Sequence, residues 1–234
     1  VFREPYMIPK MRYMAQQPEK YSEEQRYQMV THMIHLMQRS GRISTVYTGA
    51  ENLPKEGGYI LASNHCSAID PMIVCQGIRH SEIHFMAKAE LFDIPVLKHV
   101  IRWLNAFPVS RGSGDLTPIN TSIQVIQDKE ILGIFPEGTR SKDGNLLRFK
   151  SGLALIAQQT GAPVLPVTIT YCDPKKKFRS RVVVNYGKLM TCEELGIHPS
   201  ENNGAAADLS HARELKEATR KIHSVMEELK QQNL

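Results

Sequence analysis

The feature that most constrains the fold of this chain is an alternation of short apolar or β-branched runs with segments of helical pattern. The runs predict strands at 43–48, 59–63, 83–88, 106–110, 131–135, 164–170 and 181–187. The intervening segments predict helices at 71–78, 91–104, 117–127, 151–160 and 211–230. Such alternation is typical of an α/β fold with a largely parallel central sheet flanked by helices on both faces. Only residues 180–187 favour an antiparallel strand.

A further helix is predicted before the first strand. Residues 22–39 have an amphipathic pattern, and Ser22 is suited to cap the start of the helix. Its apolar stripe is formed by Met29, Val30, Met33, Ile34 and Met37. Two interpretations remain open. The stripe packs against the protein core, or it dips into one leaflet of a membrane together with the methionine-rich and aromatic residues 1–14.

The second predicted strand leads directly into Asn64-His65-Cys66-Ser67-Ala68-Ile69-Asp70-Pro71. A histidine can act as a general base when a partner fixes its tautomer, and Asp70 is a suitable partner for His65. Asp and Pro favour a helix start, so we expect Asp70 to be an N-cap. The alternative interpretation is a helix cap with an unrelated histidine nearby.

Two neighbouring side chains have other candidate roles. A thiolate at Cys66 would permit an acyl-enzyme intermediate. However, adjacent residues of an extended segment point in opposite directions, so Cys66 is poorly placed for activation by His65. Ser67 is better suited to support the loop by hydrogen bonding. The sequence has no Gly-x-Ser-x-Gly elbow, which argues against an α/β-hydrolase.

A second block, Phe135-Pro136-Glu137-Gly138-Thr139-Arg140-Ser141, follows a later predicted strand. Together, Asn-His-x-x-x-x-Asp and Phe-Pro-Glu-Gly-Thr-Arg-Ser resemble the glycerolipid acyltransferase family, which includes the 1-acylglycerol-3-phosphate acyltransferases. Two shorter blocks, 107–111 (Phe-Pro-Val-Ser-Arg) and 164–167 (Val-Leu-Pro-Val), stand in the order in which the family has them. The resemblance covers roughly residues 43 to 190.

The resemblance implies transfer of a fatty acyl group from acyl-CoA or acyl carrier protein to the free hydroxyl of lysophosphatidic acid in phospholipid synthesis. His65 would be the base and Asp70 its orienting partner, with the substrate hydroxyl in place of an enzyme nucleophile. No cofactor other than the acyl-donor co-substrate is implied. Another acceptor, such as glycerol 3-phosphate or a different lysophospholipid, and a catalytically inactive lipid-binding relative are the alternatives.

The resemblance also assigns an acceptor site. Its members are Arg111, Glu137, Gly138, Thr139 and Arg140, and Lys88 is a further candidate because it ends a predicted strand. Ligands of open parallel sheets bind beyond the carboxyl ends of the strands, so these residues can converge. The two arginines could instead be surface charges. The carboxylate of Glu137 would repel phosphate, so hydroxyl binding or loop bracing suits it better.

The block at 105–111 departs from the family pattern. Family members often have glycine before the aromatic position and an acidic residue before the arginine, whereas this chain has Ala106 and Ser110. Arg111 therefore lacks that neighbouring partner, so the resemblance constrains the reaction more closely than the acceptor.

Composition narrows the class of protein. The chain has 234 residues, 41% hydrophobic and 23% charged, which fits one globular enzyme domain. Its formal charge is +5, which suits an anionic partner. Because only 7% of residues are aromatic and the sequence has no nucleic-acid-binding motif, we expect a phosphorylated substrate or a membrane surface as partner, and not nucleic acid. The basic run 175–181 is either a solvated loop or a membrane contact.

Cysteine usage and hydropathy suggest the location. The four cysteines form no paired framework and no zinc spacing with histidine, so we expect reduced thiols and no metal site. No run of apolar residues is long enough to span a bilayer.

Because the chain begins with Val1, the question whether a membrane anchor precedes it stays open. We expect a membrane-associating segment at 1–40, an acyltransferase domain at 41–234, and peripheral or monotopic attachment at the cytoplasmic face of the cell membrane. The sequence leaves acyl-chain length and oligomeric state open.

Overall fold

The computed structural model describes residues 22–40, 43–78, 80–95, 97–110, 116–173, 181–198 and 209–232. Its strands are β1 (Ser44–Thr48), β2 (Tyr59–Ser63), β3 (Ile83–Lys88), β4 (Phe107–Val109), β5 (Ile131–Ile134), β6 (Val164–Tyr171) and β7 (Arg181–Tyr186). Its α-helices are α2 (Glu23–Arg39), α3 (Asp70–Gly77), α4 (Leu97–Trp103), α5 (Thr117–Gln127), α6 (Gly152–Thr160), α7 (Cys192–Leu195) and α8 (Leu209–Gln231). Two 3-10 helices, η2 (Ala50–Asn52) and η3 (Ala89–Asp93), complete the described elements.

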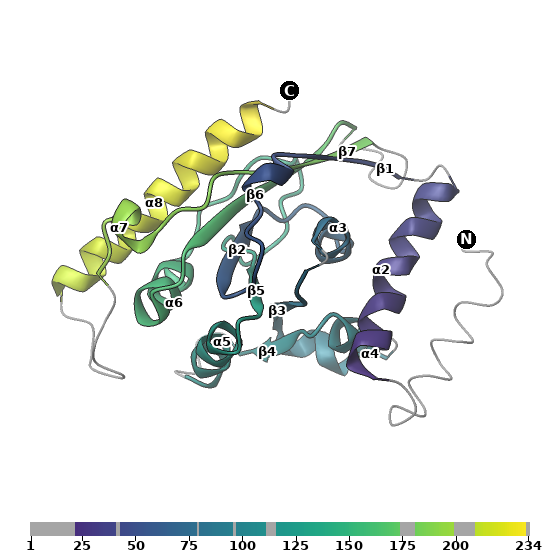
Figure 1. Ribbon diagram of the computed structural model, residues 1–234, viewed down its shortest axis with the longest axis horizontal. Coiled ribbons are helices and arrows are strands. Elements are labelled where there is room, and N and C mark those ends of the chain that lie inside the picture. Colours follow the sequence, from purple (N-terminus) through teal and green to yellow (C-terminus); the bar gives the residue numbers. More distant parts are fainter. Residues whose placement is uncertain are drawn as a thin grey trace.

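The described strands form one seven-stranded sheet in the order β1-β7-β6-β2-β5-β3-β4 (Figure 1). Strands β6, β2, β5, β3 and β4 run parallel to one another. β7 pairs antiparallel with β6, and β1 is parallel to β7. The predicted α/β class and the antiparallel strand near residues 181–187 are therefore confirmed.

Helices cover both faces of this sheet. α2, α3 and α4 lie on one face, and α5, α6 and α8 lie on the other (Figure 1). The central strand β2 is buried along its whole length. Its side chains alternate between the two cores, with Tyr59 and Leu61 on the first face and Ile60 and Ala62 on the second. Burial on both faces explains why the strand is almost continuously apolar.

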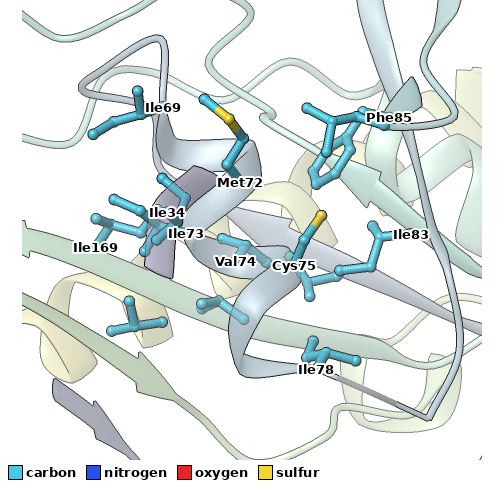
Figure 2. Packing of buried hydrophobic residues seen from close by; sticks show 14 of the residues in the cluster. Ile34, Ile69, Met72, Ile73, Val74, Cys75, Ile78, Ile83, Phe85 and Ile169 are labelled. Carbon is cyan, nitrogen blue, oxygen red and sulfur yellow. The ribbon is translucent and has the colours of Figure 1, made fainter. Parts of the chain in front are cut away.

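Helix α3 is anchored firmly in the first core. Its Ile73 and Val74 are fully buried. Figure 2 shows them beside Ile34 from α2, Ile83 and Phe85 from β3, and Ile169 from β6. Because this helix begins with Asp70, its packing fixes the position of that carboxylate relative to the sheet.

The stripe on α2 contributes to the same core. Val30 and Ile34 are 0% exposed, and Ser22 forms a capping box with Gln25 at the start of the helix. These two stripe residues therefore pack against the protein, as one of the two interpretations required. Residues 1–21 lie outside the described residues, as do the side chains of Met33 and Met37.

One segment predicted as a single helix forms two separate helices. The segment predicted as a single helix at 91–104 is divided into η3 and α4. Pro95 lies between them, and the preceding Ile94 is extended, with ψ 119°. Proline disfavours helical backbone in the residue before it, which accounts for the break. The short elements η2 and α7 were not predicted.

Candidate active site

Four of the parallel strands end at the same edge of the sheet. His65 follows β2, Glu137 follows β5, Lys88 is the last residue of β3, and Ser110 follows β4. The strands β2, β5, β3 and β4 are consecutive neighbours. The predicted convergence of these segments at one edge therefore holds for the described residues.

The His65 ring and the Asp70 carboxylate are hydrogen-bonded. The distance between His65 Nδ1 and Asp70 Oδ2 is 2.9 Å. The Asp70 side chain is 0% exposed, whereas that of His65 is 18% exposed. The pair therefore has a buried acceptor and a ring that reaches solvent. A carboxylate has no proton to donate, so Nδ1 carries the ring proton and the neutral ring keeps its lone pair on Nε2.

Asp70 is not an N-cap, and that prediction is wrong. It is the first residue inside α3, and Ile69 occupies the cap position. Its Oδ2 instead accepts hydrogen bonds from the backbone N–H groups of Cys66 (2.6 Å) and Ser67 (2.7 Å). The side chain therefore turns back and holds the loop that precedes the helix, through two backbone N–H groups next to His65.

Sequence reasoning missed Tyr171, which is the fourth donor to this carboxylate. Its hydroxyl lies 2.6 Å from Asp70 Oδ1. Burial, reinforced by the charge of Asp70, raises the pKa of Tyr171 far above its usual value, so the hydroxyl keeps its proton. One available signal was position: Tyr171 ends β6, which runs parallel to β2 and therefore finishes at the same edge.

Asn64 connects the loop to β6. Its Oδ1 accepts from the backbone N–H of Ile169 at 2.7 Å, and its Nδ2 donates to the Ile169 carbonyl at 3.0 Å. The side-chain amide thus continues the β2–β6 ladder beyond the last backbone pair at Ser63 and Val167. This explains why an asparagine precedes the histidine.

The His65 ring also rests on an aromatic stack. Its centroid lies 4.2 Å from that of Phe135, and Phe135 stacks on Phe85 at 5.7 Å. The backbone of the same histidine is held by Ser141, whose N–H donates to the His65 carbonyl at 2.7 Å. Both the first and the last residue of the Phe-Pro-Glu-Gly-Thr-Arg-Ser block therefore contact the histidine.

Glu137 braces this block from inside. It is 4% exposed, and its Oε1 accepts from the Leu147 N–H at 3.4 Å. Its Oε2 is buried with no hydrogen-bond partner among the described residues. Burial raises the pKa of Glu137 to about 7, against the lowering effect of nearby backbone N–H groups and Lys230. A carboxyl that is partly protonated near neutral pH repels an anionic ligand less than a full carboxylate would.

The other predicted acceptor residues differ in exposure. Gly138 adopts a left-handed conformation with φ 66°, and Thr139 and Arg140 are exposed beyond it. The Lys88 side chain is 49% exposed and pairs with Glu90 at 2.8 Å. Arg111 lies outside the described residues. Glu137–Arg140 form the turn between Phe135 and Ser141, the two residues that contact His65.

Cys66 is 4% exposed and belongs to the first core. Its Sγ lies 3.4 Å from Asn64 Nδ2. The thiol is therefore directed into the protein interior, as the alternation argument predicted, and not into the space beside the histidine ring.

Comparison with known proteins identifies the family of this chain. A sequence model of the family described as Acyltransferase matches residues 44–170, which is more than half of the chain. The chain belongs to the acyltransferase family. The match begins at β1 and ends in β6, so it includes every described residue placed at the candidate site except Tyr171.

Individual relatives of this acyltransferase are similar over most of its length. A 1-acyl-sn-glycerol-3-phosphate acyltransferase of Bacillus subtilis is 31% identical over 178 residues, covering 74% of this chain and 86% of that protein. A protein of the same name from Borreliella burgdorferi is 32% identical, covering 62% of this chain but only 58% of its own length. The crystal structure of the 1-acyl-sn-glycerophosphate (LPA) acyltransferase PlsC from Thermotoga maritima has a TM-score of 0.63 at 23% identity. The alignment of the two structures covers 99% of this chain and 89% of the T. maritima chain, and it shows that they share a fold.

Removing the Tyr171 hydroxyl should destabilise this acyltransferase. Tyr171→Phe leaves Asp70 Oδ1 without its donor, so the free energy of unfolding should fall by about 1–3 kcal/mol. Tyr59→Phe is the matched control because its hydroxyl is buried with no partner among the described residues, and its loss should be neutral or stabilising. Urea unfolding of both variants measures the difference, and equal effects would contradict the role given to Tyr171.

Glu137 should make stability fall as pH rises. Its pKa is higher in the folded chain (about 7) than in the unfolded chain (4.5), so the folded state binds more protons between these values. The stabilisation is complete below pH 4.5 and is lost as pH rises through 7, on the order of 2 kcal/mol. Glu137→Gln should remove this component, as measured by urea unfolding at pH 5 and pH 8. An unchanged pH dependence in the variant would contradict the assignment.

Proposed function

We propose that this acyltransferase moves a fatty acyl group from a thioester donor to the free hydroxyl of lysophosphatidic acid, forming phosphatidic acid for phospholipid synthesis. The observation that supports this most is the hydrogen-bonded pair of His65 and Asp70, with the ring partly open to solvent. The names of the B. subtilis and B. burgdorferi relatives support the choice of acceptor.

The reaction follows from the tautomer of the ring. The acceptor hydroxyl attacks the thioester carbonyl carbon while Nε2 of His65 takes the hydroxyl proton. Asp70 then stabilises the imidazolium that forms. When the tetrahedral intermediate collapses, the C–S bond breaks, the new ester keeps the acyl group, and the proton passes from His65 to the departing thiolate. The two substrates and His65 account for every bond and proton in this scheme, so the scheme includes no cofactor or metal ion.

The acceptor phosphate needs cations near the base. Arg140 is exposed on the turn that contacts His65, and arginine suits phosphate because it forms two parallel hydrogen bonds. We assign it to the acceptor phosphate together with Arg111 and Lys88. Gly138 and Thr139 shape the same turn, and the partly neutral Glu137 holds it without strong repulsion of the phosphate.

The acceptor is a lipid, so the enzyme must work at a membrane surface. Among the described residues, no helix has both the length and the apolar character that a bilayer crossing needs. We propose peripheral or monotopic attachment at the cytoplasmic face of the membrane through the part of segment 1–40 that precedes the buried stripe of α2, because Val30 and Ile34 pack in the protein core. The basic residues 3, 10 and 12 would meet anionic headgroups.

Loss of the base should abolish the reaction. We expect His65→Ala to lower acceptor-dependent release of free thiol by about 10²–10⁴-fold, which is the usual contribution of a positioned general base. The assay supplies palmitoyl-CoA or acylated acyl carrier protein with lysophosphatidic acid. His198→Ala is the matched control because His198 is exposed and follows α7, outside the site.

Thiol release that survives His65→Ala would contradict the mechanism and return attention to Cys66. Release that occurs with glycerol 3-phosphate but not with lysophosphatidic acid would contradict the acceptor alone. Absence of release with both donors across several acceptors would favour a lipid-binding protein without catalytic activity.

A further inference from the structure

The C-terminal helix α8 contacts the chain that follows the Phe-Pro-Glu-Gly-Thr-Arg-Ser block at two points. Lys230, in the last turn of the helix, donates a hydrogen bond from Nζ to the carbonyl of Gly144. Two turns earlier, the His223 ring meets the Phe149 ring edge-on at 4.6 Å. Residues two turns apart lie on the same face of a helix, so α8 presents one face to this part of the chain.

Core packing fixes the orientation of that face. Ile222 and Met226 are 0% exposed and belong to the second core. Near the end of the helix, the Leu229 carbonyl accepts a hydrogen bond from Asn185 Nδ2 of β7 at 3.4 Å. The last turn of α8 is therefore anchored to the sheet, and this anchor determines where the half-buried Lys230 side chain can reach.

A chain of hydrogen bonds leads from Lys230 to the backbone of His65. Lys230 holds the Gly144 carbonyl, and the Gly144 N–H donates to Ser141 Oγ at 3.1 Å. The Ser141 N–H in turn donates to the His65 carbonyl at 2.7 Å. Ser141 is 2% exposed, so water has little access to the middle of this chain. The end of α8 is therefore connected to the histidine through one short turn.

The charge of Lys230 also acts on the buried carboxyl of Glu137. Burial raises the pKa of Glu137 to about 7. Hydrogen bonds from the backbone of Leu147 and His65 lower this pKa, as does the ammonium group of Lys230, whereas the charge of Asp70 raises it. Lys230 therefore favours the ionised form of Glu137, which is the stronger acceptor for these backbone N–H groups.

A second lysine of the same helix provides an internal comparison. Lys221 donates from Nζ to the carbonyl of Glu194 in α7. Like Lys230, it joins α8 to a backbone carbonyl of another segment. However, α7 contains none of the residues placed at the candidate active site. Loss of Lys221 therefore reports the effect of such a contact on the fold alone.

We propose that Lys230 is a positioning residue for the proposed base, His65. Its ammonium group fixes the turn at Gly144 and the buried carboxyl of Glu137, and these two hold the backbone of the histidine. The inference rests on the proposed function, because the role of the lysine is in the proposed acyl transfer. Lys230 lies beyond residues 44–170, which match the family model. The C-terminal helix thus supports the base in addition to covering the sheet.

The first test is kinetic and uses the whole enzyme with palmitoyl-CoA and lysophosphatidic acid. Lys230→Met keeps the apolar stem but removes the charge and the donor. Its kcat should fall about tenfold, because a small displacement of a catalytic group is costly. Its KM for lysophosphatidic acid should stay within about twofold, since uniform binding of the acceptor is unchanged. Lys230→Arg keeps a cation and a donor and should recover most of the lost kcat, whereas the matched control Lys221→Met should keep the wild-type value.

The second test needs no turnover. In Lys230→Met the pKa of Glu137, followed by ¹³C NMR of its carboxyl, should rise above its wild-type value of about 7, because a nearby cation no longer favours the carboxylate. The Ser141 N–H should exchange with solvent at least about fivefold faster, because the turn that it belongs to has lost its tether. Both quantities should be unchanged in Lys221→Met.

The outcomes separate this proposal from the function it rests on. A wild-type kcat in Lys230→Met would overturn it, and so would an equal loss of kcat in Lys221→Met. A raised KM at constant kcat would overturn it in favour of direct contact with the acceptor. Unchanged titration of Glu137 together with unchanged exchange of Ser141 would overturn it whatever the activity. If the wild-type enzyme transfers no acyl group to any acceptor, the proposed function fails, and the NMR and exchange results still decide whether Lys230 holds the block.

Discussion

The buried carboxylate of Asp70 is the group on which the rest of the site depends. Four donors from two segments meet it: the His65 ring and the backbone N–H groups of Cys66 and Ser67 from the loop after β2, and the Tyr171 hydroxyl from the end of β6. Burying a charge is costly unless it is paired and hydrogen-bonded, so this arrangement holds only when all of these segments are in place. The carboxylate thus couples the loop after β2, the start of α3 and the end of β6, so the geometry of the proposed catalytic pair depends on the fold around it.

Parallel strands place the remaining groups. β2, β5, β3 and β4 are neighbours that end at one edge, so residues distant in sequence share that edge without specific long-range contacts. Two loops then touch directly, because Ser141 holds the backbone of His65 and Phe135 stacks on its ring. The same block continues through 146–151, which lead into α6. The proposed acceptor turn is therefore part of one continuous stretch, 135–151, that is packed against the loop of His65.

The sequence predicts this architecture well where a local pattern determines the structure. Strand limits agree within one residue because each run is short, apolar or β-branched, and bounded by turn residues. The helix at 91–104 failed because Pro95 outweighs apolar periodicity. Asp70 was assigned to the cap from residue preference, but its partners come from the preceding loop and from Tyr171, which lies 101 residues further along the chain. The buried environment of Glu137 and the contacts of α8 with the chain around it arise from tertiary packing, which no local pattern contains.

The most direct test of the account is the tautomer of His65, measured by ¹⁵N NMR of the ring nitrogens in wild-type enzyme at a pH where the ring is neutral. The account predicts a protonated Nδ1 and an unprotonated Nε2, because Asp70 accepts only from Nδ1. In Asp70→Asn this preference should weaken or reverse. A wild-type ring with its proton on Nε2 would leave no lone pair facing the acceptor hydroxyl, and it would contradict the role assigned to the pair.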